Sequence, residues 1–181
     1  MVDIGCGIGT WLRPWQEISK NGIEILGIDD NEMDEKSFFI DKKYYHKTNL
    51  TKPAKEILKE IFKKQKPRKF DLVQSLEVGE HFSEEFAPNF IDLLTNLGDL
   101  VLFSAAIPYQ GGTHHVNCRE PGYWANLFKE RGFDCFDILR AGLWDVKNIA
   151  YYYRQNIMLY ARGDSIKALQ ERGFKKCAKP S

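Results

Sequence analysis

The sequence predicts an α/β fold built around a mostly parallel sheet, and three observations support this. Strand-like and helix-like stretches alternate along the whole chain, several strand-like stretches are almost continuously apolar, and a glycine-rich turn follows the first of them. Such alternation is typical of parallel strands covered by helices. Ligands in these folds bind at the carboxyl ends of the strands, so functional residues are sought directly after each strand.

The first half of the chain contains four predicted strands and two predicted helices. The strands are residues 1–4, 23–29, part of 42–50 and 70–75, and the helices are 11–20 and 53–64. The run at 23–29 is nearly continuous in apolar residues, as expected of a strand buried on both faces. Pro14 is tolerated in the first helix because it falls near the first turn.

The second half continues the alternation. Its predicted helices are residues 83–97, 123–131 and 164–172, and its predicted strands are 99–107, 133–139 and 156–162. The strand at 99–107 is the most apolar of the chain, and Gly132 ends the second of these helices.

Length and composition favour one domain without a strong electrostatic preference. The chain has 181 residues, 43% of them hydrophobic, and a formal net charge of +1. This balance gives no global attraction to nucleic acid or anionic lipid, and no apolar run approaches the roughly 18 residues of a membrane helix. The start of the chain lacks the features of a signal peptide. Its four cysteines are scattered, which predicts reduced thiols and a cytoplasmic protein.

The first glycine turn points to an adenosine-type ligand. Asp3 precedes Gly5-x-Gly7-x-Gly9, and Thr10 stands where a dinucleotide fingerprint needs its third glycine, which makes NAD or FAD a poorer match. Asp29 and Asp30 follow the second strand. A carboxylate there can accept hydrogen bonds from both ribose hydroxyls and repels a 2′-phosphate.

Polar residues also follow the later strands. After the third strand, Asn49 can bond an adenine edge while Leu50 packs on its face. Ser75, Leu76 and Glu77 follow the fourth strand, where the reacting end of a ligand would lie. The fifth strand leads into IPYQGGTHHVN, a loop rich in hydrogen-bonding groups with two adjacent histidines.

Together these pieces resemble the class I S-adenosylmethionine-dependent methyltransferases. The resemblance rests on VDIGCGIGTW, LGIDD, FDLVQSLEVGEHF and VLFSAAIPYQGGTHHVN in that order, and the later PGYWANLFKERGF and LWD…YYYRQNIMLYA look like a subgroup of small methyltransferase domains. It implies a Rossmann-like three-layer sandwich with a seven-stranded sheet, mostly parallel, and an antiparallel strand near the C-terminus. It also implies that residues 1–181 form one methyltransferase domain that lacks the usual N-terminal helical segment.

The resemblance implies S-adenosyl-L-methionine as cofactor and a role for each matching position. Asp3 would lie near the methionine amino group, the glycine turn would pass under the methionine and ribose, and Asp29 would take the ribose hydroxyls. The implied cofactor-binding residues are Asp3, Gly5, Cys6, Gly7, Asp29, Asp30, Asn49, Leu50, Ser75 and Leu76.

The acceptor side is expected to use His115 and Glu77. Methyl transfer to a hydroxyl benefits from a general base, and a histidine titrates near operating pH. His115 is the first candidate, with His114 as its neighbour, and Glu77 would bind substrate or accept a proton. We expect O-methylation of a small-molecule or glycan acceptor, with no nucleic-acid or membrane partner.

Two alternatives remain open. The first is a catalytically inactive domain that binds S-adenosylmethionine or has lost it, serving as a regulatory subunit. The second is a metal-dependent RNA 2′-O-methyltransferase, because Glu77, Glu80 and His81 with His114 or His115 resemble the metal site of the small-RNA terminal 2′-O-methyltransferases. The ExxEH spacing also occurs in metal-free relatives, so we expect no metal, with Glu80 and His81 capping the next helix or bonding the sheet.

Two further clusters have ordinary interpretations. The basic run at 63–69, the one feature suggesting RNA, precedes the fourth strand, at the end opposite the expected site, and indicates a solvated helix terminus. The aromatic run Tyr151–Arg154, with Trp144, suits stacking on a sugar or planar substrate. Packing between the last two strands is the favoured interpretation.

Overall fold

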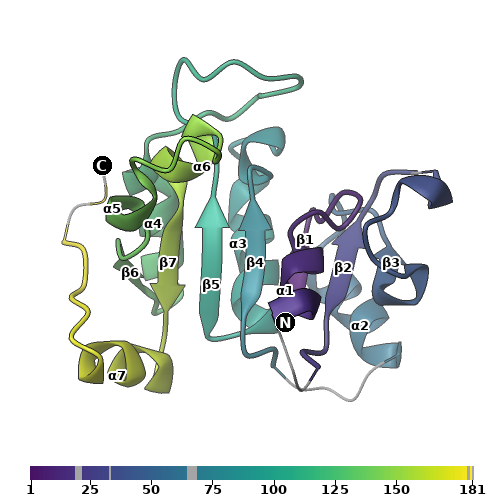
Figure 1. Cartoon of the computed structure of the whole chain (residues 1–181), viewed down its shortest axis with the longest axis horizontal. Helices are drawn as coiled ribbons and strands as arrows, with labels where there is room; N and C mark the ends of the chain where they lie inside the picture. The colour runs from purple at the N-terminus through teal and green to yellow at the C-terminus, as the bar shows by residue number, and fades with distance from the viewer. Residues whose placement is uncertain (19–21, 33, 65–68, 179, 181) are drawn as a thin grey trace.

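The computed structural model describes residues 1–18, 22–32, 34–64, 69–178 and 180. Their strands form one seven-stranded sheet in the order β3-β2-β1-β4-β5-β7-β6 (Figure 1). The strands are β1 Val2–Ile4, β2 Leu26–Asp29, β3 Tyr45–Lys47, β4 Val73–Leu76, β5 Leu100–Ser104, β6 Asp134–Phe136 and β7 Met158–Ala161. The first five run parallel, and β7 is antiparallel to both β5 and β6. The predicted fold class is therefore confirmed.

Helices cover both faces of this sheet. They are α1 Leu12–Ile18, α2 Ala54–Lys64, α3 Ala87–Leu97, α4 Pro121–Lys129, α5 Arg140–Leu143, α6 Tyr151–Asn156 and α7 Asp164–Glu171. Short 3-10 turns lie between them: η1 Glu35–Ser37, η2 Lys42–Tyr44 and η3 Gly79–His81.

Alternation along β5 shows how the sequence produces three layers. Successive side chains of a strand point to opposite faces. Val101 and Phe103 join the large core cluster that contains the apolar faces of α2, α3 and α4. Leu100 and Leu102 pack instead with the cluster that includes residues of α7. A strand buried on both faces must therefore be apolar throughout, as the sequence of β5 is.

The region between β6 and β7 differs from the prediction. Both strands are shorter than expected, and residues 139–156 contain the helices α5 and α6. The favoured interpretation of the aromatic run was wrong, since β6 and β7 pair directly, with Cys135 opposite Tyr160. The run lies in α6, and the ring of Tyr153 meets that of Trp11 edge-on at 4.9 Å.

The basic run at 63–69 falls largely outside the described residues, since 65–68 belong to the gaps. Within the described part of the chain, no helix is long and apolar enough to cross a membrane.

Candidate functional site: the carboxyl edge of the sheet

The glycine turn after β1 has the conformation of a ligand-binding loop. Gly5, Gly7 and Gly9 all have positive φ, at 78°, 53° and 84°, a region that residues with a side chain adopt at a cost. A Cβ at Gly5 would lie 2.4 Å from Val78, and one at Gly9 would lie 2.7 Å from Ile40. At Gly7 a Cβ would meet nothing within 4 Å. Gly5 and Gly9 are therefore required by packing, whereas Gly7 borders open space.

Asp29 ties this turn to the end of β2. Asp29 is only 4% exposed. Its Oδ2 accepts a hydrogen bond from the Gly7 amide at 2.8 Å. Oδ1 accepts from the backbone and side-chain nitrogens of Asn31, at 2.9 and 2.8 Å. Asp30 is exposed to solvent. The two acidic residues thus differ: Asp29 is part of the loop, and Asp30 is not.

Asp3 is a buried acid that lacks a donor for one of its oxygens. The residue is 2% exposed, and its Oδ2 has no hydrogen-bond partner. Burial raises the pKa of Asp3 to about 7; the amide of Gln74 opposes this shift and the negative charge of Asp29 adds to it. Trp15 fixes that amide by donating from Nε1 to Oε1 of Gln74 at 3.3 Å. An unpartnered buried carboxylate oxygen is a site prepared for a donor or a cation.

The other predicted cofactor residues are occupied within the protein. The Oδ1 atom of Asn49 accepts from Thr51, and Leu50 lies in the main core. Ser75 is fully buried, and its hydroxyl donates to the carbonyl of Ile4 at 2.9 Å. Cys6 and Leu76 are also buried, and the Cys6 thiol donates to the carbonyl of Gly7 at 3.4 Å. Burial raises the pKa of the Cys6 thiol, which fits a space-filling role.

Glu77 is held over the ends of β4 and β5 by two side-chain amides. Its φ is 56°, and its backbone amide donates to the carbonyl of Ser104 at 3.0 Å. The carboxylate accepts from Nε2 of Gln110 at 2.6 Å and from Nδ2 of Asn156 at 3.2 Å. Asn156 also donates to Oε1 of Gln110 at 2.8 Å. Sequence reasoning missed Gln110 and Asn156, although Gln110 lies in the loop that it had marked as functional.

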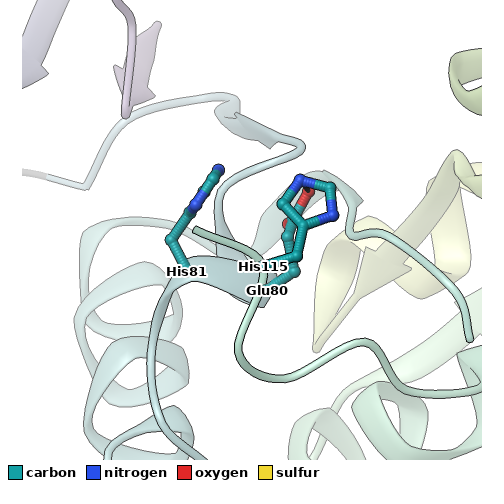
Figure 2. A group of neighbouring side chains, drawn as sticks. All are labelled: Glu80, His81 and His115. Atoms are coloured by element: carbon teal, nitrogen blue, oxygen red, sulfur yellow. Dashed lines mark ion pairs between the residues drawn. The ribbon is translucent and has the colours of Figure 1, made fainter. Parts of the chain in front are cut away.

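A second acid at this edge, Glu80, has two adjacent histidines. Glu80 is fully buried, and neither carboxylate oxygen has a hydrogen-bond partner. Nε2 of His115 lies 3.8 Å from Oε1 of Glu80, and the rings of His81 and His115 are 5.1 Å apart. Figure 2 shows His81 beside His115, with the Glu80 carboxylate behind the His115 ring. Burial and the charge of Glu77 raise the pKa of Glu80 to about 8.

The structure corrects the expected role of Glu80 and His81. The next helix, α3, has Phe86 at its N-cap, with no side-chain capping bond, and the Glu80 carboxylate bonds no strand. Of the four-ligand set weighed from the sequence, the structure brings together Glu80, His81 and His115. Glu77 is engaged by Gln110 and Asn156 instead.

A large cavity lies elsewhere in the described part of the chain. A hollow of about 970 Å³ lies at the amino ends of β1, β2 and β4 and is lined by Met1, Gly22, Leu26, Lys69 and Asp71, among others. It lacks the glycine turn and the buried acids. The carboxyl edge therefore remains the candidate site on chemical grounds.

The chain was compared with known families, proteins and structures. A scan against protein-family models and a search of curated proteins found no match. Solved structures do match: magnesium protoporphyrin IX methyltransferase from Synechocystis PCC 6803 with bound S-adenosylhomocysteine has a TM-score of 0.58 at 18% identity, covering 90% of this chain and 73% of that one.

The chain has the fold of the class I S-adenosylmethionine-dependent methyltransferases. An S-adenosylmethionine-dependent methyltransferase from Archaeoglobus fulgidus matches with a TM-score of 0.58 at 19% identity, over 88% of this chain and 83% of that one. The methyltransferase domain of a bacterial Hen1 protein matches with a TM-score of 0.52 at 15% identity, over 88% of both. At such identities the likeness establishes the methyltransferase fold, and the function has to be argued from the site.

Proposed function

We propose that this protein is an S-adenosyl-L-methionine-dependent methyltransferase. The observation that carries the proposal is the pairing of two buried acids, Asp3 and Asp29, at the ends of adjacent strands with an open glycine position between them. A cofactor with a cationic amino end, a ribose and an adenine needs these groups in that order.

The chemistry of each group fits one part of the cofactor. The unpartnered Oδ2 of Asp3 suits the ammonium of the methionine moiety. An ionised carboxylate has about four acceptor positions, and Asp29 uses three of them. A ribose hydroxyl would take the fourth, and its neighbour would replace the Asn31 amide. The open side of Gly7 leaves room for the ligand to pass over the backbone.

When bound, the cofactor supplies a methyl group activated by its sulfonium, so the chain has to contribute position and electrostatics. Glu77 is suited to accept a hydrogen bond from an acceptor hydroxyl, because Gln110 and Asn156 fix its carboxylate. His115 stays our predicted general base. We infer O-methylation of a small molecule or glycan.

An aromatic cavity supports a planar or sugar acceptor. Trp144, Tyr151, Arg154 and Gln155 line a hollow of about 240 Å³ between α5 and α6. Trp144 is 58% exposed and Tyr151 is 56% exposed. Exposed aromatic faces beside an arginine are suited to stacking on rings.

Calorimetric titration with S-adenosylhomocysteine tests the cofactor assignment. Binding to the wild-type chain should be measurable, and Asp29→Ala should weaken it at least tenfold, since the ribose acceptor and the loop anchor are both lost. Asp71→Ala is the matched control, because Asp71 is an exposed acid at the amino end of β4. No heat from the wild-type chain at millimolar ligand would refute the proposal.

A further inference from the structure

Three side chains beside Glu77 form a group of potential metal ligands. One ligand atom from each of Glu80, His81 and His115 lies within 4.8 Å of the others. The cluster is separate from the groups assigned to the cofactor, so a metal ion could bind there whether or not the cofactor is present.

The backbone holds the cluster in place. The amides of Val116 and Asn117 both donate to the carbonyl of Glu80 at 3.0 Å, which fixes His115 beside Glu80. Gly79 packs closely against the core, because a Cβ there would lie 3.0 Å from both Phe103 and Trp124. The ligand atoms are therefore positioned by packing and hydrogen bonds of the fold.

The hydrogen bonds of His81 show which nitrogen is free. Its Nδ1 lies 3.2 Å from the carbonyl oxygen of His114. A carbonyl can only accept, so this bond requires the proton on Nδ1 and leaves the Nε2 lone pair for another partner. A backbone carbonyl bound to the far nitrogen is the usual support of a metal-binding histidine.

The Glu80 carboxylate lacks the partner that its burial requires. Both oxygens are buried without a donor, and a buried polar group without a partner costs free energy. The 3.8 Å between Nε2 of His115 and Oε1 of Glu80 is too long for a hydrogen bond. Two ligand atoms at about 2.1 Å from a tetrahedral ion are roughly 3.4 Å apart. Nε2 of His115 and Oε1 of Glu80 would therefore have to move only slightly closer to bind the same ion.

We propose that Glu80, His81 and His115 bind a divalent transition-metal ion, with Zn²⁺ as the best match. Two imidazoles and one carboxylate suit zinc and its neighbours, whereas Mg²⁺ and Ca²⁺ prefer all-oxygen sites. Three protein ligands leave one position of a tetrahedral ion for water or an oxygen of the acceptor. A bound ion would occupy the Nε2 lone pair of His115, so the general-base role proposed above for His115 applies to the metal-free protein, and in the metal-bound protein His115 would be a ligand.

Competition titration with Zn²⁺ against a chromophoric chelator tests this proposal. The wild-type chain should bind one ion, and His81→Ala and His115→Ala should each weaken binding at least 100-fold. His114→Asn is the matched control, because His114 has a φ of 59° that asparagine tolerates and its imidazole is outside the cluster. Its affinity should stay within threefold of the wild type.

Equal affinities of the wild type, His81→Ala and His115→Ala would overturn the proposal, as would an equal loss in His114→Asn. Circular dichroism checks that each variant is folded, and His81→Gln and His115→Gln replace any that is not. X-ray absorption of the zinc-loaded wild type gives an independent reading. Nitrogen and oxygen at about 2.0–2.2 Å are expected.

A sulfur ligand at about 2.3 Å would contradict the assigned set, because it would place the ion at Cys118, whose Sγ lies 3.7 Å from Nδ1 of His115. Titration of the metal-free protein with S-adenosylhomocysteine keeps the two proposals distinguishable. Cofactor binding without zinc binding would refute the metal site alone.

Discussion

At Asp3, stability and ligand binding oppose each other within one residue. The carboxylate is buried with an unpartnered oxygen, which penalises its charged form in the empty protein. The same charge is what a cationic ligand would bind. A protein that needed only stability would have an apolar or amide side chain at this position.

The pH dependence of stability tests this opposition. The pKa of Asp3 rises from 3.8 to about 7 on folding, so between these values the folded chain binds more protons than the unfolded chain. The stability that depends on protonated Asp3 is therefore fully present below about pH 4. It is lost as the pH rises through 7, because Asp3 then has to ionise while buried. Because Asp3→Asn cannot ionise, its stability relative to the wild type should rise by about 2–4 kcal/mol between pH 4 and 8.

Urea unfolding at a series of pH values measures this difference. Asp71→Asn serves as the control, since an exposed acid should give a curve parallel to that of the wild type. Parallel curves for Asp3→Asn and the wild type would show that Asp3 is not strained by burial.

At the scale of elements, α6 contacts the segment that follows the glycine turn. Tyr153 packs edge-on against Trp11, which begins the segment leading into α1. Asn156 at the end of α6 holds Glu77. A helix of six residues therefore supports both the cofactor side and the acceptor side of the proposed site.

Truncation of Tyr153 should show this support directly. Tyr153→Ala removes a half-buried ring and its aromatic contacts with Trp11 and Tyr152, and should lower the free energy of unfolding by about 1–3 kcal/mol. Tyr151→Ala, two residues earlier and 56% exposed, should change it by about 0.5 kcal/mol or less. Chemical denaturation of both variants makes the comparison, and similar losses would mean that α6 is not anchored through Tyr153.

At the scale of the whole molecule, the parallel part of the sheet could be predicted and the ligand-side network could not. The apolar run at 99–107 contains β5. A strand that is buried on both faces needs apolar side chains at consecutive positions, and such a run is visible in the sequence. Gln110 and Asn156 reach Glu77 from 33 and 79 residues away. No local sequence pattern indicates that these side chains meet in the fold. In addition, α6 is too short to show helical periodicity.

The Glu80 cluster shows the same limit. The sequence shows the histidines and the acid of this cluster. From the sequence alone, however, Glu77 and His114 were equally good candidates for metal ligands. Selection among them depends on where the loop after β5 returns, which is decided by the amides of Val116 and Asn117 on the Glu80 carbonyl.

Cofactor binding should stabilise the entire fold. At a concentration of 100 times the dissociation constant, S-adenosylhomocysteine should add about 2.7 kcal/mol to the free energy of unfolding. For a chain of this size the Tm should rise by roughly 5–11 °C. Differential scanning calorimetry measures the shift, and Asp29→Ala at the same ligand concentration should show a much smaller one. Equal shifts would place the ligand away from the proposed site.

The central claim is that the glycine turn after β1 cradles S-adenosylmethionine, and calorimetric titration of two glycine variants tests it most directly. Gly7 and Gly22 both have positive φ, 53° and 73°, and a Cβ at either meets no atom within 4 Å. Alanine at each should therefore cost a similar 1–2 kcal/mol of stability or so, but only Gly7 borders the proposed ligand.

We predict that S-adenosylhomocysteine binds the wild type and Gly22→Ala with similar affinity and binds Gly7→Ala at least tenfold more weakly. Wild-type affinity in Gly7→Ala would contradict the account.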